Sequence, residues 1–267
     1  GKGGGPYNME LRVNPSELVV GNNSNISLRL SYLRTGEPVE DLQLAHERLL
    51  HIFIVDSEFE TFAHLHVENG NGYGPASGGE FQVSHAFDKA GSYQLVVEFV
   101  HRSRIWHKTF DLLVKGSHKV DYPSFAEVER LEGYEAALSG PKEVVSGREV
   151  EFNLSVKKND IPTTDLRLFL GSELHGAVWR EDGQHFGHLH SFTPKMAFLI
   201  NEIRSRENGG VVSPVKLQEI LVEVMCSVGE LVYPGPRVPV RYTFPANGRY
   251  YIFAQVAPEG VTRTFKF

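Results

Sequence analysis

Residues 41–66 read DLQLAHERLLHIFIVDSEFETFAHLH, and residues 165–190 read DLRLFLGSELHGAVWREDGQHFGHLH. The two stretches begin 124 residues apart, and 9 of their 26 positions are identical. Self-similarity at a fixed spacing is the sequence signature of a repeated structural unit. The chain is therefore predicted to be an internal duplication of one unit.

The same register extends to both sides of these stretches. Downstream, FDKAGSYQLVVEF (87–99) matches FPANGRYYIFAQV (244–256) at a spacing of 157, so the second copy carries an insertion of 33 residues. The predicted organisation is a first repeat at 1–117, a linker at 118–132 and a second repeat at 133–267, with the insertion at about 191–232.

Each copy has the sequence pattern of β-strands. NISLRLSYL (25–33) and REVEFNLSVKK (148–158) alternate apolar and polar residues with a period of two. HIFIV (51–55), YQLVVEFV (93–100) and YYIFAQV (250–256) are short and rich in β-branched and aromatic residues. Several short strands in about 110 residues are typical of an antiparallel sandwich. The predicted fold class is all-β, with two tandem immunoglobulin-like β-sandwich domains.

The insertion is predicted to be partly helical. Ser213 is a candidate N-cap, Pro214 follows at the first helical position, and apolar residues then recur at three- and four-residue spacing. This pattern favours one amphipathic helix that packs on a sandwich or across the domain interface. A lid, a partner-docking helix and a membrane-surface helix are the alternatives.

Composition excludes several classes of function. The formal net charge of −6 and the pI near 6.1 provide no basic footprint for nucleic acid. The apolar runs are far shorter than the roughly 20 residues of a membrane span. Cys226 is the single cysteine, which excludes an intrachain disulfide and a multi-cysteine metal site. The opening GKGGGPY lacks the features of a signal peptide, so an exported protein would be present here in its mature form.

Each copy contains three histidines with the spacing H-x12-H-x-H. These are His51, His64 and His66 in the first copy and His175, His188 and His190 in the second. Residues i and i+2 of a strand share one face, so the two imidazoles of each HLH project together. The polar segment before each HLH predicts a hairpin, which can bring the first histidine beside the pair. Three imidazoles on one sheet face predict a metal site with a position left for water or a fourth donor.

Only these histidines are duplicated. The others that can be aligned, His46, His85, His101, His107 and His185, face Leu170, Tyr242, Pro258, Thr264 and Thr61. Surface or structural roles are therefore predicted for these five and for His118. Core packing alone would let the triplets diverge in the same way, so a polar function common to both copies is indicated. Hydrogen-bonded scaffolding is the alternative for the triplets.

Copper is the first choice of metal and zinc the second. Ligation by neutral imidazole alone, without Cys or Met in the motif, argues against a blue-copper centre and a thiolate Cu(I) carrier. Intrinsic affinity then favours Cu²⁺ over Zn²⁺. Met196, Met225 and Cys226 lie in the insertion and could supply a soft donor to the second site. The alternative for the methionines is core packing.

The pattern of LH, an apolar strand, F-x-HLH, a Gly-rich loop and F-x-x-x-G-x-Y resembles immunoglobulin-like domains of the bacterial envelope that are associated with copper and other heavy metals. This resemblance implies an extracytoplasmic protein, periplasmic, secreted or anchored, with the six duplicated histidines as ligands. The chain departs from the pattern in two ways: such domains often continue HLH with Pro, whereas this chain has Val67 and Ser191, and they do not have the insertion.

A fainter likeness, to copper–zinc superoxide dismutase, rests on the H-x-H pair and the loop after it, but the disulfide cysteines are absent. The chain also lacks G-x-S-x-G, Walker, dinucleotide and H-E-x-x-H motifs, so no catalytic apparatus is predicted beyond what a metal supplies. The predicted function is therefore metal storage, sensing or delivery, with a protein that receives the metal as the second partner. A copper-dependent redox enzyme and a structural or adhesive module without metal are the alternatives.

Overall fold

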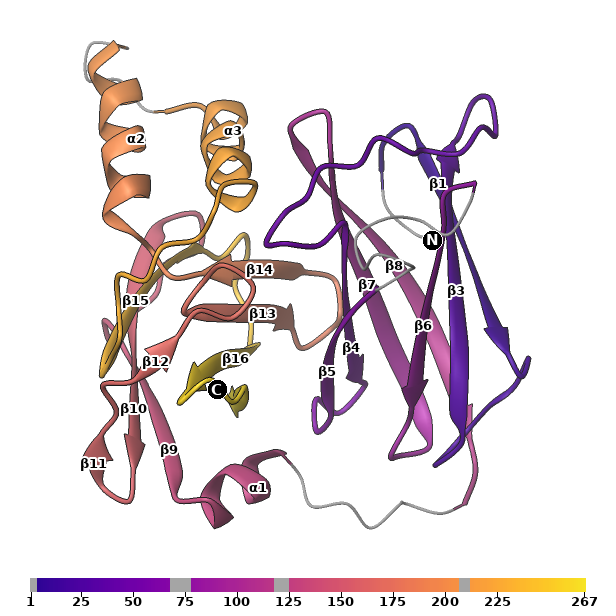
Figure 1. Ribbon diagram of the computed structural model, residues 1–267, viewed down its shortest axis with the longest axis horizontal. Helices are drawn as coiled ribbons and strands as arrows, with labels where there is room; N and C mark the ends of the chain where they lie inside the picture. Colours follow the sequence, from indigo (N-terminus) through magenta and orange to yellow (C-terminus); the bar gives the residue numbers. More distant parts are fainter. Residues whose placement is uncertain (1–3, 68–77, 118–124, 207–211) are drawn as a thin grey trace. The chain divides into compact units, whose positions relative to one another are not determined.

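The chain divides into two compact units, Gly1–Tyr122 (unit 1) and Pro123–Phe267 (unit 2). The computed structural model describes residues 4–67, 78–117, 125–206 and 212–267. Each unit is a β-sandwich with its own apolar core (Figure 1). The predicted fold class, two tandem immunoglobulin-like sandwiches with a partly helical insertion in the second, is confirmed.

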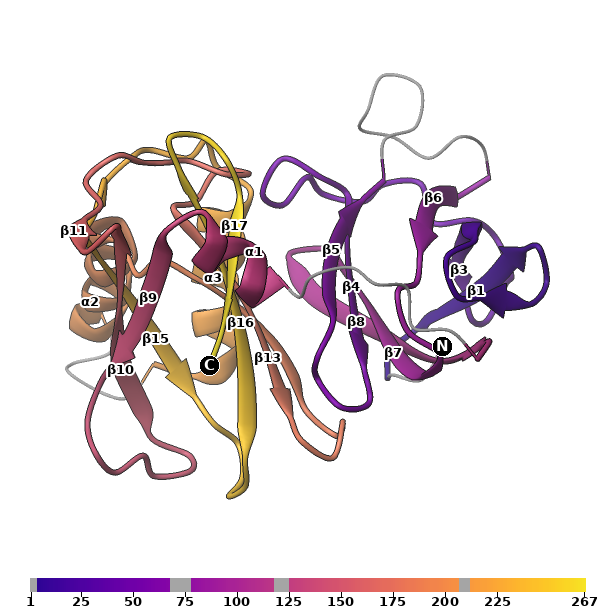
Figure 2. The same ribbon diagram turned by 90° about the horizontal axis from the view of Figure 1, so that it is seen from below.

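The strands of unit 1 form two sheets that lie face to face (Figure 2). One sheet has the order β1-β3-β6 and the other β2-β8-β7-β4-β5, with β2 parallel to β8. Strands β1, β3 and β6 take the places of A, B and E of an immunoglobulin-like fold, and β4, β7 and β8 take those of C, F and G. The bounds are β1 (Tyr7–Asn14), β2 (Leu18–Val19), β3 (Asn23–Tyr32), β4 (Leu50–Asp56), β5 (Phe62–His66), β6 (Glu80–Ala86), β7 (Gly91–His101) and β8 (Arg104–Lys115).

Unit 2 repeats this arrangement. Strand β10 lies between β9 and β15 in one sheet, and the other sheet has the order β12-β16-β13-β14 with β17 also paired to β16. The strand bounds are β9 (Tyr134–Ser139), β10 (Glu149–Lys158), β11 (Ile161–Pro162), β12 (Leu166–Arg167), β13 (Leu174–Arg180), β14 (Phe186–His190), β15 (Arg237–Thr243), β16 (Tyr250–Pro258) and β17 (Arg263–Lys266). Helix α1 (Phe125–Leu131) precedes β9, within the segment 118–132 that was predicted as a linker.

The apolar side chains that recur every second residue along the strands fill the space between the two sheets of each unit. In β3, Ile26, Leu28 and Leu30 are fully buried, whereas Ser27 and Arg29 between them point away from the core. Burial of one such apolar side chain is worth about 2 kcal/mol relative to exposure. In β10 of unit 2, fully buried side chains again stand two residues apart along the strand. The alternation that predicted the strands therefore also builds both cores.

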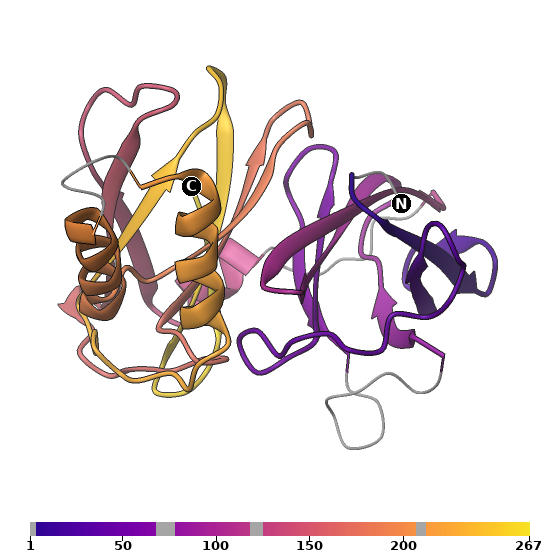
Figure 3. The same ribbon diagram turned by 90° about the horizontal axis from the view of Figure 1, so that it is seen from above.

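The insertion contains α2 (Pro194–Arg206) and α3 (Pro214–Met225), which lie side by side (Figure 3). Helix α3 begins as predicted: the Ser213 hydroxyl accepts a hydrogen bond from the backbone N–H of Lys216 at 3.3 Å. Helix α2 was not predicted, although Thr193 caps it in the same way, by accepting from the N–H of Met196 at 3.3 Å. Neither helix, nor any other in the described part of the chain, is long and apolar enough to cross a membrane.

A tyrosine corner is present at the start of the F strand in both units. The hydroxyl of Tyr93 in β7 donates to the carbonyl of Lys89 at 2.7 Å, and that of Tyr250 in β16 donates to the carbonyl of Ala246 at 2.8 Å. This feature is a mark of immunoglobulin-like sandwiches. It explains why a tyrosine follows the glycine turn in both AGSY and NGRY.

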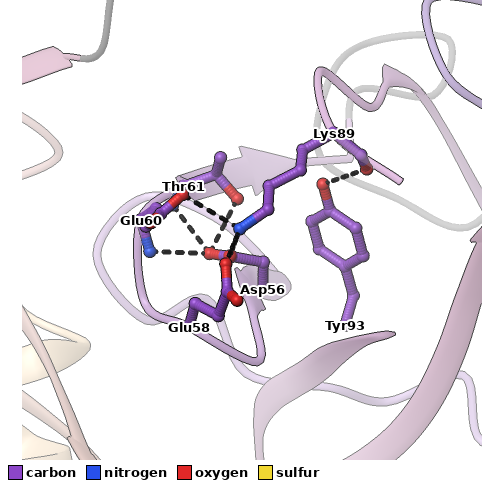
Figure 4. A network of polar contacts seen from close by, with 6 residues as sticks. All are labelled: Asp56, Glu58, Glu60, Thr61, Lys89 and Tyr93. Atoms are coloured by element: carbon purple, nitrogen blue, oxygen red, sulfur yellow. Dashed lines mark hydrogen bonds and ion pairs between the residues drawn. The ribbon is translucent and has the colours of Figure 1, made fainter. Parts of the chain in front are cut away.

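The turn between β4 and β5 is closed by a polar cluster around Asp56 (Figure 4). One Asp56 oxygen accepts from the backbone N–H groups of Glu60 and Thr61 at 2.8 and 2.7 Å. The Lys89 ammonium lies 3.1 Å from the other Asp56 oxygen and also contacts the carboxylates of Glu58 and Glu60. The Lys89 ammonium thus pairs with three carboxylates. The cluster stabilises the turn of the hairpin that carries the first histidine triplet.

Candidate metal centre

The hairpins β4–β5 and β13–β14 bring each histidine triplet onto one sheet face. His51 lies directly opposite His66, and His175 lies directly opposite His190. Directly opposed residues of an antiparallel pair point to the same face, and the second histidine of each triplet stands two residues before the third. The structure therefore brings together all three residues of both triplets. Their role as metal ligands stays a prediction.

In unit 1 three ring nitrogens converge. Nδ1 of His51 lies 3.3 Å from Nε2 of His64, which in turn lies 3.1 Å from Nε2 of His66. One nitrogen from each ring falls within 4.8 Å of the other two. The converging donors are thus one Nδ1, from His51 on β4, and two Nε2, from His64 and His66 on β5.

The spacing of these nitrogens fits a small divalent ion. With metal–nitrogen bonds of about 2.0–2.1 Å, two ligands at the tetrahedral angle stand about 3.3–3.4 Å apart. The two measured separations, 3.3 and 3.1 Å, lie at or slightly below that edge. The same separations fit a hydrogen bond between two imidazoles. A bound metal ion would replace the proton of that hydrogen bond. Small shifts of the rings would thus admit an ion without rearrangement of the strands.

A backbone carbonyl fixes which nitrogen of His51 faces the cluster. The carbonyl oxygen of Ala45 lies 2.7 Å from Nε2 of His51. A carbonyl can only accept, so Nε2 carries a proton, and in the neutral ring Nδ1 then presents its lone pair to the other two rings. Metal-bound histidines commonly donate their second ring N–H in this way, which fixes the tautomer and the orientation of the ring.

In unit 2 the positions of the three rings and the carbonyl contact of the first histidine match those of unit 1. Nε2 of His175 donates to the carbonyl of Phe169, which is 124 residues from Ala45. The first and second rings are 5.5 Å apart in unit 1 and 5.7 Å in unit 2, the first and third 5.1 and 4.9 Å, and the second and third 4.4 and 4.1 Å. The angles between the ring planes are 35° and 30°, 90° and 88°, and 60° and 58° in the same order.

The supporting carbonyls were not predicted. Ala45 and Phe169 each begin a tight turn that is closed by reciprocal backbone hydrogen bonds, to Arg48 and Ser172 respectively. Both central residues of each turn have positive φ, between 46° and 75°. Asn-Gly is the usual sequence signal for this type of turn. The first turn has His46-Glu47 instead, so its side chains did not predict the turn. In the second turn Gly171 supplies part of the usual signal, and the constant spacing of 124 residues relates the two turns.

The histidines outside the triplets have structural partners in several cases. His101, which is fully buried, contacts the Tyr7 hydroxyl and lies 2.8 Å from Asp41, whose carboxyl pKa it lowers by hydrogen bonding. His107 lies 2.7 Å from Glu98, and His185 contacts the Tyr242 hydroxyl. His118 lies outside the described residues.

The soft donors of the insertion have other surroundings. Met225 is buried at the end of α3, and Cys226 follows it as an exposed residue. Although the residue as a whole is exposed, partial desolvation of its thiol raises the pKa of Cys226, which disfavours the thiolate form that binds metals. Cys226 belongs to no cluster of His, Cys, Asp or Glu ligand atoms in the described ranges. A soft donor to the second triplet therefore stays a prediction without structural support.

The comparison with solved structures yields remote similarities. A Salmonella alpha-2-macroglobulin mutant is 12% identical at a TM-score of 0.30, and the alignment covers 100% of this chain and 15% of that one. The Escherichia coli adhesin FdeC is 10% identical at a TM-score of 0.27, with coverage of 97% and 63%. Red sea bream transglutaminase is 8% identical at a TM-score of 0.24, with coverage of 96% and 29%. The chain thus spans less than two thirds of each, and similarities of this size carry no information about function.

The comparison with protein families is more direct. No curated protein matches the chain significantly. One family model, described as "Domain of unknown function (DUF8832)", matches residues 4–116 and again residues 127–267. Each match includes one histidine hairpin, and together the matches cover most of the chain. The chain therefore belongs to the DUF8832 family and contains two copies of its domain.

Proposed function

We propose that each unit binds one metal ion through its histidine triplet. The observation that carries this proposal is the agreement of the two units, in which the three ring separations match to within about 0.3 Å and the first histidine donates to the corresponding carbonyl. Histidines that only tied a hairpin together would not need the same three-ring geometry in both units. A shared ligand accounts for the rings and the carbonyls together.

Copper is the preferred ion and zinc the second. The converging donors of unit 1 are imidazole nitrogens, which suit both ions, and the order of intrinsic affinities places Cu²⁺ above Zn²⁺. Three ligands leave a coordination position for water, for a fourth donor or for a donor of another protein. This open position suits storage, sensing or delivery of the ion to a protein partner.

An extracytoplasmic location, periplasmic, secreted or anchored, is part of the proposal. It rests on the resemblance of the F-x-HLH and F-x-x-x-G-x-Y pattern to envelope domains. A sandwich that stands without disulfides is compatible with this location, because both cores are continuous clusters of buried apolar side chains. The chain would then bind its metal outside the cytoplasm, and the protein that receives the metal would lie there too.

The test is metal analysis of the purified chain, followed by titration of the metal-free chain with Cu²⁺ and Zn²⁺. Two bound ions per chain are expected near neutral pH, with weaker binding as the pH falls through the histidine range near 6.5, because protons compete for the ring nitrogens. The double variants His64→Ala/His66→Ala and His188→Ala/His190→Ala should each lose one ion. His85→Leu, which removes a histidine of unit 1 outside the triplet, should retain both.

Two results would contradict the proposal. If each double variant binds as many Cu²⁺ and Zn²⁺ ions as the original chain does, the triplets are not metal sites and the structural or adhesive module becomes the better description. If the copper-loaded chain turns over superoxide or another substrate, and this turnover is lost in the double variants, the protein is an enzyme and not a carrier.

A further inference from the structure

The insertion of unit 2 forms a pocket of about 400 Å³ against one sheet of the sandwich. Helix α2 provides one wall, Val212 and Leu217 around the start of α3 provide a second, and side chains of β10 and β15 provide a third. Small-molecule sites in proteins have volumes of roughly 300–1,000 Å³, so this pocket is large enough for a ligand. We call it the insertion pocket.

The wall formed by the sheet is polar because it belongs to the outer face. Val150 and Tyr242 are directly opposed on β10 and β15, and both pack on the core of unit 2. Successive side chains of a strand point to opposite faces, so the neighbouring pair Glu149 and Thr243 points away from the core. Both of these residues line the insertion pocket. One wall of the pocket can thus form hydrogen bonds with a ligand.

The wall formed by α2 combines apolar side chains with a cation. Ala197 and Ile200 line the pocket, and Arg204 lies one turn further along the same face of the helix. Helix α2 buries none of its side chains, and both Ala197 and Ile200 are only half-buried. An apolar group in the pocket would remove more of their surface from water, which favours binding.

The charge that the pocket offers to a ligand comes from Arg204. The other arginine of the lining, Arg241, is paired: its Nε lies 3.1 Å from a carboxylate oxygen of Glu151, and its Nη1 lies 3.5 Å from one of Glu149. Its Cζ also lies 4.0 Å from the centroid of the Phe192 ring. In the part of the chain that the structure describes, Arg204 makes no ion pair, and it is exposed. The pocket therefore favours an anion.

We infer that the insertion pocket binds a small carboxylate that has an apolar body. The carboxylate pairs with the guanidinium of Arg204, which can offer two parallel N–H donors to one carboxylate group. The apolar body contacts Ala197 and Ile200 of α2 and Leu217 of α3. An apolar lining with a few polar groups that fix the orientation of the ligand is typical of small-molecule sites. The inference is independent of the histidine triplets and of metal binding.

The test is calorimetric titration of the full-length chain with octanoate. One octanoate per chain is expected, with a Kd below about 1 mM. Three matched probes separate the contributions: butyrate lacks most of the apolar body, octan-1-ol lacks the charge, and octylammonium has the opposite charge. Each should bind at least about tenfold more weakly than octanoate, because each loses either the apolar contact or the ion pair.

Substitutions on α2 then locate the site. Arg204→Gln should weaken octanoate binding by about tenfold. Its matched control is Arg206→Gln, which removes a basic residue of the same helix that is not part of the pocket lining and should leave the affinity unchanged. Ala197→Phe fills the pocket without a change of charge and should abolish binding, whereas Phe198→Ala, at a 61% exposed position outside the lining, should not. Circular dichroism checks that each variant retains its secondary structure.

Three results would overturn the inference. The first is a failure of octanoate to bind at millimolar concentration. The second is an affinity that folded Arg204→Gln and Ala197→Phe chains leave unchanged, which would place the octanoate elsewhere. The third is binding of octylammonium as tight as that of octanoate, which would show that Arg204 does not select the charge of the ligand.

Discussion

Substitution of Glu173 should destabilise unit 2 selectively. This residue is 1% exposed and directly precedes β13. One of its oxygens accepts from the backbone N–H groups of Val232 and Tyr233 at 2.7 and 3.0 Å, and the other accepts from the Ser191 hydroxyl at 2.6 Å. A single carboxylate therefore joins the base of the second histidine hairpin to both ends of the insertion.

The size of the effect follows from these three bonds. A hydrogen bond to a charged group is worth about 1.5–3 kcal/mol, and a buried donor that loses its acceptor adds a desolvation cost. Relaxation and water entry recover part of the sum, so Glu173→Ala should lower the free energy of unfolding of unit 2 by about 3–5 kcal/mol. Glu173→Gln keeps an oxygen for the two backbone donors and should cost about 1–2 kcal/mol.

Urea unfolding followed by tryptophan fluorescence can measure this in one unit. The chain has two tryptophans, Trp106 in unit 1 and the fully buried Trp179 in unit 2. A Trp106→Phe background leaves Trp179 as the reporter of unit 2. Glu143→Ala, at an exposed position of the same unit, serves as the control. If Glu173→Ala shifts the transition by less than about 1 kcal/mol, or no more than the control does, the carboxylate does not hold the insertion in place.

Two further predictions concern unit 1, with Trp106 as the reporter in a Trp179→Phe background. Burial lowers the pKa of His85, so below about pH 6.5 the unfolded chain binds a proton on His85 more readily than the folded unit does. The free energy of unfolding of unit 1 should therefore fall as the pH drops below about 6.5. His85→Leu should reduce the slope of this dependence by up to about 1.4 kcal/mol per pH unit. An unchanged slope would show that His85 does not sense pH. Lys89→Met should cost about 1–2 kcal/mol because the buried Asp56 loses its cation. Lys115→Met breaks an exposed pair with Glu17 and should leave the stability unchanged within error. Equal losses would show that burial of Asp56 adds nothing to its pair.

The hairpins and the convergence of the histidines could be predicted because each depends on side-chain periodicity. Alternation with a period of two places His64 and His66 on one face, and a short polar turn limits the register that His51 can take. The observed pairing of His51 with His66 lies within that limit. Repetition of the same spacing in the second copy made a chance arrangement hard to accept. Periodicity and duplication together thus locate the cluster.

The parts that could not be predicted depend on the backbone or on packing. The carbonyl of Ala45 supports His51, but a carbonyl belongs to every residue, and the turn that presents it uses His46 and Glu47 where Asn-Gly is usual. The sequence Thr193-Pro194 is a capping signal for α2. The helix buries none of its side chains, however, so its sequence lacks the apolar face by which an amphipathic helix is recognised. Elements that contribute no side chains to the core, such as α2, were therefore not predicted from the sequence.

The division between shared and unshared residues also bears on the enzyme alternative. A redox or hydrolytic enzyme needs a group that moves protons beside the metal, and Glu98 with His107 is the pair in unit 1 that could do so. Unit 2 has Gln255 and Thr264 at these positions, and neither side chain exchanges protons near neutral pH. If catalysis were the purpose of the triplets, unit 2 would have kept the ligands and lost the proton carrier. Binding alone requires only what both units retain, three convergent rings and the carbonyl that orients the first of them.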